Sequence, residues 1–141
     1  LVTQDPTGTA HPARITVPGM SMGGKTGTAQ VRRISQRERD SGVLKNEELP
    51  WRFRDHALFV GYGPIEDPRY AISVVVEHGG GGSAVAAPIA RDILLRAQLG
   101  DVPPPELYPA SQRRDIERLH RELPILPTPP VPTGRTVRSQ A

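Results

Sequence analysis

Two stretches near the middle of the chain carry the strongest hydrophobic pattern. Residues 56–62 (HALFVGY) and 70–77 (YAISVVVE) are rich in β-branched, aromatic and other apolar side chains, which is typical of strands. The residues between them, GPIEDPR, are mostly turn formers. Because so short a link joins strands that lie side by side, the pattern predicts an antiparallel hairpin.

A helix is expected after this hairpin. The second strand runs into four glycines, residues 79–82, and Ser83 has the side chain of a helix N-cap. Apolar residues then recur at helical spacing, and Pro88 requires the helix either to begin near Ala87 or to bend. The stripe expected to face the core consists of Ile89, Ala90, Ile93, Leu94 and Ala97.

Shorter extended segments are expected before the hairpin. Residues 13–17 (ARITV) and 24–31 (GKTGTAQV) alternate well enough to form strands. The stretch 32–51 is highly charged and poor in apolar residues, which predicts a long exposed connection. The order of strand, long loop, two strands and helix indicates an α+β fold, in which a helix packs on one face of an antiparallel sheet.

The last part of the chain has a different composition. Of the 16 prolines, more than half follow Gly100, which predicts a largely disordered, Pro-rich tail over residues 100–141. Only residues 111–123 carry an apolar stripe that favours a helix. The predicted folded region is therefore 1–99. Since 36% of residues are hydrophobic and 4% aromatic, its core is expected to be small.

Charge and composition narrow the classes of partner. The net charge is +3, but the arginines are scattered and not interleaved with aromatic residues, so no nucleic-acid partner is expected. The absence of cysteine excludes disulfides and thiolate metal sites, and the four histidines lack metal-ligand spacing, so no metal site is expected. No apolar run is long enough to span a membrane. Because the chain begins with Leu1, we expect a fragment or a processed product.

Residues 19–31 (GMSMGGKTGTAQV) carry the candidate chemistry, and they fit two patterns. Read from Gly19, the pattern G-x-x-x-x-G-K-T is that of a phosphate-binding loop, which must be followed by a helix. Gly27 and Thr28 are poor helix formers, and the residues beyond them offer no apolar helix face. An extended strand explains the same residues better, and the phosphate loop remains a remote alternative.

The strand reading gives these residues distinct chemical uses. Lys25 and Gly27 would point to one face, and Thr26 and Thr28 to the other. With no side chain at Gly27, a peptide substrate could come close to the backbone. Threonine hydroxyls can hold a carboxylate, and a lysine supplies positive charge beside a reacting serine.

The segment GGKTGTAQV resembles the third active-site motif of penicillin-binding proteins. The upstream GTA of residues 8–10, the Asp55-His56 pair with HALFVGYGP, and YAISVVVEHGGGGSAVAAPIARDIL resemble further blocks of the same family, in the same order. Together they are similar to the closing part of a class B transpeptidase domain of the elongation-specific, penicillin-binding protein 2 type. The resemblance covers roughly residues 5–99.

This resemblance implies a peptidoglycan D,D-transpeptidase, in which a serine attacks the D-Ala-D-Ala bond of a stem peptide and the acyl group passes to an amine. It also implies roles for the motif. Lys25 matches the lysine that organises the site and tunes proton movement, Thr26 and Thr28 match the hydroxyls that bind the terminal carboxylate, and the Thr28 N–H matches half of the oxyanion hole. Gly27 matches the position that admits the peptide. The expected catalytic residues are Lys25 and Thr28, and the expected substrate-binding residues are Lys25, Thr26, Gly27 and Thr28.

The family also uses S-x-x-K and S-x-N motifs. In this chain no serine has Lys three residues later or Asn two residues later, so neither motif is present. We therefore expect the chain to be inactive without upstream sequence. The resemblance implies no cofactor, and the implied partners are stem peptides, β-lactams and the elongation machinery. It places the domain on the periplasmic face of the bacterial cytoplasmic membrane, through an anchor absent from this chain. A non-catalytic penicillin-recognising sensor and a β-lactamase remain alternatives, and Asp55-His56 and Glu77-His78 are expected to be structural.

Overall fold

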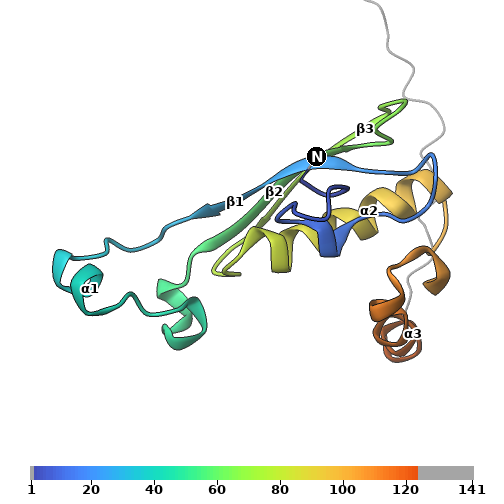
Figure 1. The fold of residues 1–141 in the computed structure, drawn as a ribbon. Coiled ribbons are helices and arrows are strands. Elements are labelled where there is room, and N and C mark those ends of the chain that lie inside the picture. The colour runs from blue at the N-terminus through green and yellow to red at the C-terminus, as the bar shows by residue number, and fades with distance from the viewer. Residues whose placement is uncertain (1, 124–141) are drawn as a thin grey trace, which may run out of the picture.

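The structure, a computed structural model, describes residues 2–123. Its centre is a three-stranded antiparallel sheet in the order β1 (Gly23–Ala29), β2 (His56–Gly63) and β3 (Tyr70–Val76). The hairpin expected from the apolar pattern is therefore confirmed as β2 and β3. Figure 1 shows the strands as one twisted layer, with α2 and α3 on the same side of it.

The two faces of the sheet have opposite environments. Phe59 and Ala57 of β2 are fully buried, and Val74 of β3, opposite Phe59, joins them in the core. On the other face, Val60 is 53% exposed, and Val75 is 59% exposed. The core of the described residues therefore lies on one side of the sheet, which confirms the expected α+β arrangement.

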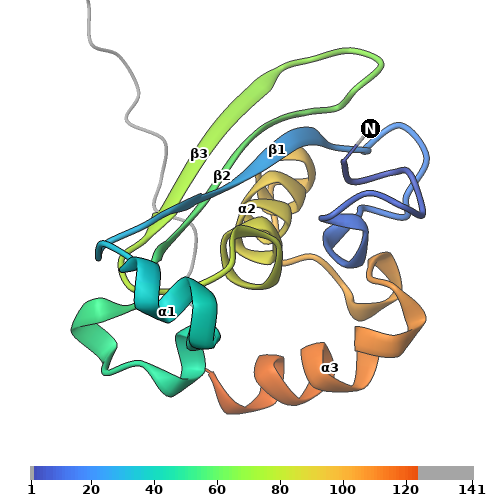
Figure 2. The same cartoon turned by 60° about the vertical axis from the view of Figure 1, so that its left-hand side comes forward.

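Helix α2 (Ala87–Leu99) covers that buried face, as Figure 2 shows. It begins at Ala87 with Pro88 in its first turn, as predicted, and ends at Gly100, whose φ of 75° suits glycine. Ser83 is not the expected N-cap, because it lies inside a preceding π-helical turn, Gly82–Ala86.

The predicted core stripe of α2 is partly wrong. Ile89 is 39% and Ile93 is 51% exposed, and Ala97 is exposed as well, although Leu94 and Ala90 are buried as expected. The buried face also contains Ala87, Leu95 and the charged Arg91. The small alanines let the helix approach the sheet, and the guanidinium of Arg91 lies 4.6 Å from the centre of the Tyr108 ring.

The strand predicted over residues 13–17 does not form. Instead, Pro12 lies in a short 3-10 turn, His11–Ala13, and no residue of 14–17 is assigned to a strand. Ile15 is nevertheless buried, so the apolar pattern located a core residue but not its backbone conformation.

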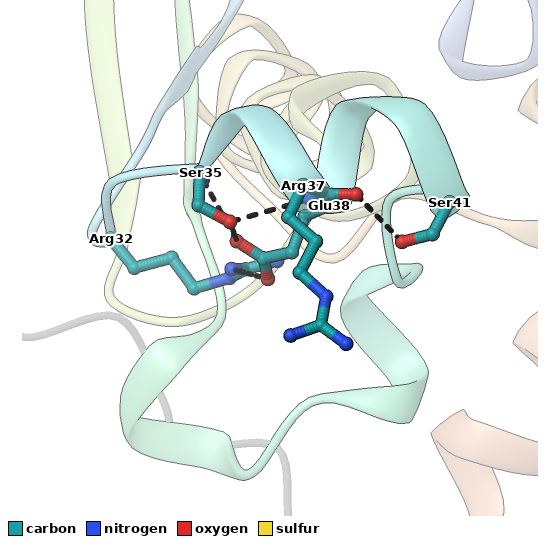
Figure 3. A network of polar contacts seen from close by, with 5 residues as sticks. All are labelled: Arg32, Ser35, Arg37, Glu38 and Ser41. Atoms are coloured by element: carbon teal, nitrogen blue, oxygen red, sulfur yellow. Dashed lines mark hydrogen bonds and ion pairs between the residues drawn. The ribbon is translucent and has the colours of Figure 1, made fainter.

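The connection from β1 to β2 is more ordered than its polar composition predicts. It contains α1 (Gln36–Ser41) and the 3-10 turns Asn46–Glu48 and Trp51–Phe53. Ser35 caps α1, because its hydroxyl accepts the Glu38 N–H at 3.3 Å while the Glu38 carboxylate accepts the Ser35 N–H at 2.8 Å (Figure 3). Arg32 also binds this carboxylate at 2.6 Å. These hydrogen bonds, the one from the Ser35 backbone first, lower the pKa of Glu38 to about 2.

The C-terminal segment also differs from expectation. The helix predicted over 111–123 is confirmed as α3 (Arg113–Glu122). However, residues 100–123 are not disordered, since they also contain the 3-10 turns Pro105–Leu107 and Ala110–Gln112. Tyr108 and Ile116 are buried in the core. The remainder of the predicted tail, 124–141, lies outside the described residues.

A polar network fastens this segment to the rest of the fold. The Arg91 guanidinium donates to Gln112 Oε1 at 2.6 Å, and Gln112 Nε2 donates to the Pro12 carbonyl at 2.7 Å. Arg91 also forms an ion pair with Asp92 at 2.8 Å, and these partners explain why a charged side chain can be buried there. The network also ties the segment after α2 to the turn that follows residues 8–10.

We expect this attachment to weaken in alkali. Burial, followed by the charge of Asp92, raises the pKa of Tyr108 from 10.0 to about 12. A raised pKa means that the stabilisation is complete below pH 10 and is lost as the pH rises toward 12. Limited proteolysis of residues 100–123 should accelerate across this interval. Tyr108→Phe keeps the ring but cannot ionise, so its proteolysis should change less; equal acceleration in both proteins would contradict this assignment.

Candidate active site

The motif at residues 25–28 lies in the middle of β1 and is fully extended. Lys25 pairs with Val60, Thr26 with Phe59, and Thr28 with Ala57. Since Phe59 and Ala57 are buried and Val60 is exposed, both threonines share the core face while Lys25 and Gly27 share the open face. This alternation confirms the strand prediction. The phosphate-loop alternative is wrong, because Lys25 is followed by the rest of β1 and not directly by a helix.

The position of β1 in the sheet leaves one of its edges available. Among residues 2–123, β1 pairs with β2 alone, and β2 separates it from β3. An edge strand presents unpaired N–H and C=O groups to its free side, and these groups can pair with an added extended peptide. The motif therefore combines a free strand edge with a cation above the sheet and hydroxyls below it.

The side chains of the motif have few competing contacts. Lys25 is exposed, and its ammonium donates to the Thr26 carbonyl at 2.9 Å. The hydroxyl oxygens of Thr26 and Thr9 lie 3.2 Å apart, within hydrogen-bond distance. Thr28 is exposed at the end of the motif. The ammonium and the Thr28 hydroxyl are thus accessible, whereas the Thr26 hydroxyl is oriented by a neighbour.

Thr9 is the site residue that reasoning from sequence missed. It lies in the GTA of residues 8–10, and that motif was the available signal, although no role for Thr9 was predicted. The segment is folded on itself, since the Ala10 N–H donates to the Val2 carbonyl at 3.1 Å, and Ala10 is fully buried. The Thr3 hydroxyl donates to the Met22 carbonyl, immediately before β1. The N-terminal segment therefore supports the start of the motif strand.

Asp55, His56 and His78 make structural contacts, as expected. His56 Nδ1 accepts the His78 N–H at 2.8 Å, and His78 Nδ1 lies 3.0 Å from the Arg54 carbonyl. The Asp55 N–H donates to Asn46 Oδ1 at 2.9 Å. These bonds join the β1–β2 connection to the turn after β3, and none of them involves residues 25–28.

The described part of the chain holds neither a metal-binding cluster nor a membrane-spanning helix. Across residues 2–123, no group of three or more histidine, aspartate or glutamate side chains is arranged to hold a metal ion. In the same range, no helix is long and apolar enough to cross a membrane.

Comparison with known proteins agrees with this geometry. Residues 1–95 match the family described as the penicillin-binding protein transpeptidase domain. The chain is 35% identical over 97 residues to peptidoglycan D,D-transpeptidase MrdA of Haemophilus influenzae, a match that covers 67% of this chain and 14% of that protein. The chain thus spans only a small part of the curated relatives that it matches.

Two solved structures are similar as well. Pseudomonas aeruginosa PBP2, solved in complex with WCK 5153, is 36% identical with a TM-score of 0.50, over 71% of this chain and 18% of that one. Helicobacter pylori PBP2, solved in complex with MreC, is 29% identical with a TM-score of 0.52, over 70% of this chain and 16% of that one. The extended motif strand, the order of the blocks and these matches lead to one conclusion: the chain belongs to the penicillin-binding protein transpeptidase family, and it is similar to the PBP2 type.

Proposed function

We propose that this chain forms the closing part of the catalytic domain of a peptidoglycan D,D-transpeptidase. The observation that carries the proposal is the placement of Lys25–Thr28 on a strand whose outer edge is free. The term complete protein here means this chain together with upstream sequence that supplies the serine motifs it lacks. By itself, the chain is expected to have no activity, because it has no nucleophile in an S-x-x-K pattern.

The proposed reaction uses the motif for recognition and for charge stabilisation. The stem peptide lies along the free edge of β1 as an added strand, and Gly27 leaves room for its backbone. The terminal carboxylate of the donor accepts hydrogen bonds from the Thr26 and Thr28 hydroxyls. The Lys25 ammonium adds positive potential beside the reacting centre and helps to organise proton transfer.

The same arrangement accounts for acyl transfer. An upstream serine attacks the carbonyl of the D-Ala-D-Ala bond, and the carbonyl oxygen gains negative charge. The Thr28 N–H donates to that oxygen, and the N–H of the serine provides the second donor. The terminal D-Ala leaves, and the acyl group then passes from the serine to the amine of a neighbouring stem. A β-lactam would acylate the same serine.

The setting of the complete protein follows by similarity. We propose that it acts with the elongation machinery, a proposal supported by the Helicobacter pylori PBP2 that was solved with MreC. We further propose that its catalytic domain faces the periplasm and is anchored in the cytoplasmic membrane outside the present chain. Its substrates would be the stem peptides of peptidoglycan.

Labelling with a fluorescent penicillin tests the proposed function. The complete protein should form one stable acyl adduct on an upstream serine, and it should release D-Ala from a D-Ala-D-Ala donor. Labelling without D-Ala release would instead indicate a penicillin sensor, and rapid loss of the label would indicate a β-lactamase. Absence of any adduct would contradict the proposal.

A further inference from the structure

We propose that Gly82 is a positioning residue for the oxyanion hole. It lies against the peptide group that joins Gly27 to Thr28, and it sets the orientation of that group. The inference rests on the proposed function, since the Thr28 N–H is the donor that would face the developing oxyanion. It assigns a specific task to one member of the four-glycine run that follows β3.

The approach of Gly82 to the strands is unusually close. A Cβ atom on this residue would lie 2.3 Å from the Leu58 carbonyl oxygen, 2.5 Å from the Gly27 carbonyl oxygen and 3.1 Å from the Gly27 nitrogen. All three atoms belong to the backbone of paired strands, so no flexible side chain could move aside. Gly82 is buried directly beneath the ladder between β1 and β2.

Space, and not conformation, is what requires glycine here. Gly82 is the first residue of the helical turn Gly82–Ala86 and is not among the glycines with positive φ. An alanine could therefore adopt its backbone conformation. The nearest atoms that a side chain would meet belong to the peptide backbone of β1 and β2.

The turn that carries Gly82 cannot easily retreat. Before it, the Gly80 N–H donates to the Asp55 carbonyl at 2.8 Å, and the Asp55 N–H is held in turn by Asn46. Within it, the Val85 N–H donates to the Gly81 carbonyl at 3.1 Å, and after it α2 follows with its buried face on the sheet. Any atom added at Gly82 would therefore push the strand and not the turn.

The group that such a push would displace is the Gly27–Thr28 peptide, which carries the proposed oxyanion-hole N–H. The Gly27 nitrogen and oxygen lie beside the Leu58 carbonyl, on the side of β1 that faces β2. Because successive residues of a strand alternate in direction, the Thr28 N–H then faces the free edge. The Gly27 carbonyl and the Thr28 N–H belong to a single planar peptide, so a push on the first turns the second.

The test uses Gly82→Ala in the complete protein, with Gly81→Ala as its matched control. Gly81 has φ −91° and ψ 130°, and a Cβ there meets nothing within 4 Å, so its substitution adds the same methyl group without a clash. Loss of an oxyanion donor costs about 10²- to 10³-fold in rate. We expect Gly82→Ala to slow acylation by a D-alanyl ester donor by about tenfold or more, and Gly81→Ala to leave it unchanged.

A second donor separates positioning from general damage. A thionoester analogue, with C=S in place of C=O, gains little from an oxyanion hole built for oxygen. Gly82→Ala should therefore lower the rate for the ester much more than the rate for the thionoester. Equal losses for both donors, or wild-type rates for the ester, would overturn the inference.

If Gly82→Ala does not fold, Asn46→Ala tests the hydrogen bonds that hold the turn in place before Gly82. It removes the acceptor that holds the Asp55 N–H, and it should give a smaller but equally selective loss for the ester. A proportionate loss for both donors, or none, would again overturn the inference. Failure of the wild-type protein to be acylated at all would overturn the proposed function together with it.

Discussion

Replacing Lys25 with alanine in the complete protein is expected to slow acylation by penicillin by about 10²- to 10⁴-fold, the range typical of a positioned proton-transfer group. The side chain is exposed, and its ammonium contacts the neighbouring Thr26 carbonyl, so its removal should leave the sheet unchanged. The rate of fluorescent penicillin labelling measures the effect, and a thermal melt confirms that the protein is folded.

Lys45 provides the matched control. It is the other lysine of the chain, and it is exposed on the connection between β1 and β2. Lys45→Ala should label at the wild-type rate. Lys25→Arg separates charge from proton transfer, because arginine keeps the positive charge but does not give up its proton near neutral pH. If Lys25→Ala labels as fast as wild type, Lys25 has no part in acylation.

Replacing Thr28 with valine is expected to reduce kcat/KM for D-Ala-D-Ala donors by about 10- to 100-fold. Valine has the same shape but no hydroxyl, so the variant loses one hydrogen bond to a carboxylate, a contribution of about 1.5–3 kcal/mol. Thr28 is exposed, and the stability change should stay within about 0.5 kcal/mol. Steady-state release of D-Ala gives the activity, and thermal unfolding gives the stability.

The chemical reason for this loss can be tested separately. Thr28→Ser keeps the hydroxyl and should retain most of the activity. A donor whose terminal carboxylate is converted to an amide should be a poor substrate for the wild-type enzyme, and Thr28→Val should make it little worse. A similar further loss on both donors would mean that Thr28 does not contact the carboxylate.

Local pattern was sufficient for the parts of the fold that depend on neighbouring residues. The hairpin of β2 and β3 follows from two apolar runs and a turn-rich link, and these signals are contained in residues 56–76. The extended form of Lys25–Thr28 follows from the poor helix propensity of Gly27 and Thr28, and pairing with β2 fixes which face each side chain occupies.

Other parts depend on contacts that a local pattern does not contain. Arg91 is buried because Tyr108 and Gln112, which follow α2 in the chain, pack against it. Periodicity within the helix does not contain these contacts, and it therefore placed Ile89 and Ile93 in the core, although both are exposed. The same contacts hold residues 100–123 against the fold. Helix α1 has no apolar face, but it did have a local signal, because Ser35 and Glu38 are spaced as a capping box.

The candidate site likewise has a part that local sequence predicts and a part that depends on distant contacts. The chemistry of Lys25, Thr26 and Thr28 can be derived from residue type and alternation along one strand. The contact of Thr9 with Thr26 joins residues 17 positions apart, and the approach of Gly82 to Gly27 joins separate elements. Such supports are visible only when the strands and turns are placed in space.

The most direct measurement is a crystal structure of the complete protein acylated by a penicillin. The antibiotic should lie along the outer edge of β1, with its carboxylate on the hydroxyls of Thr26 and Thr28 and its acyl oxygen on the Thr28 N–H. An acyl group bound away from β1, or a carboxylate that meets neither threonine, would contradict the account.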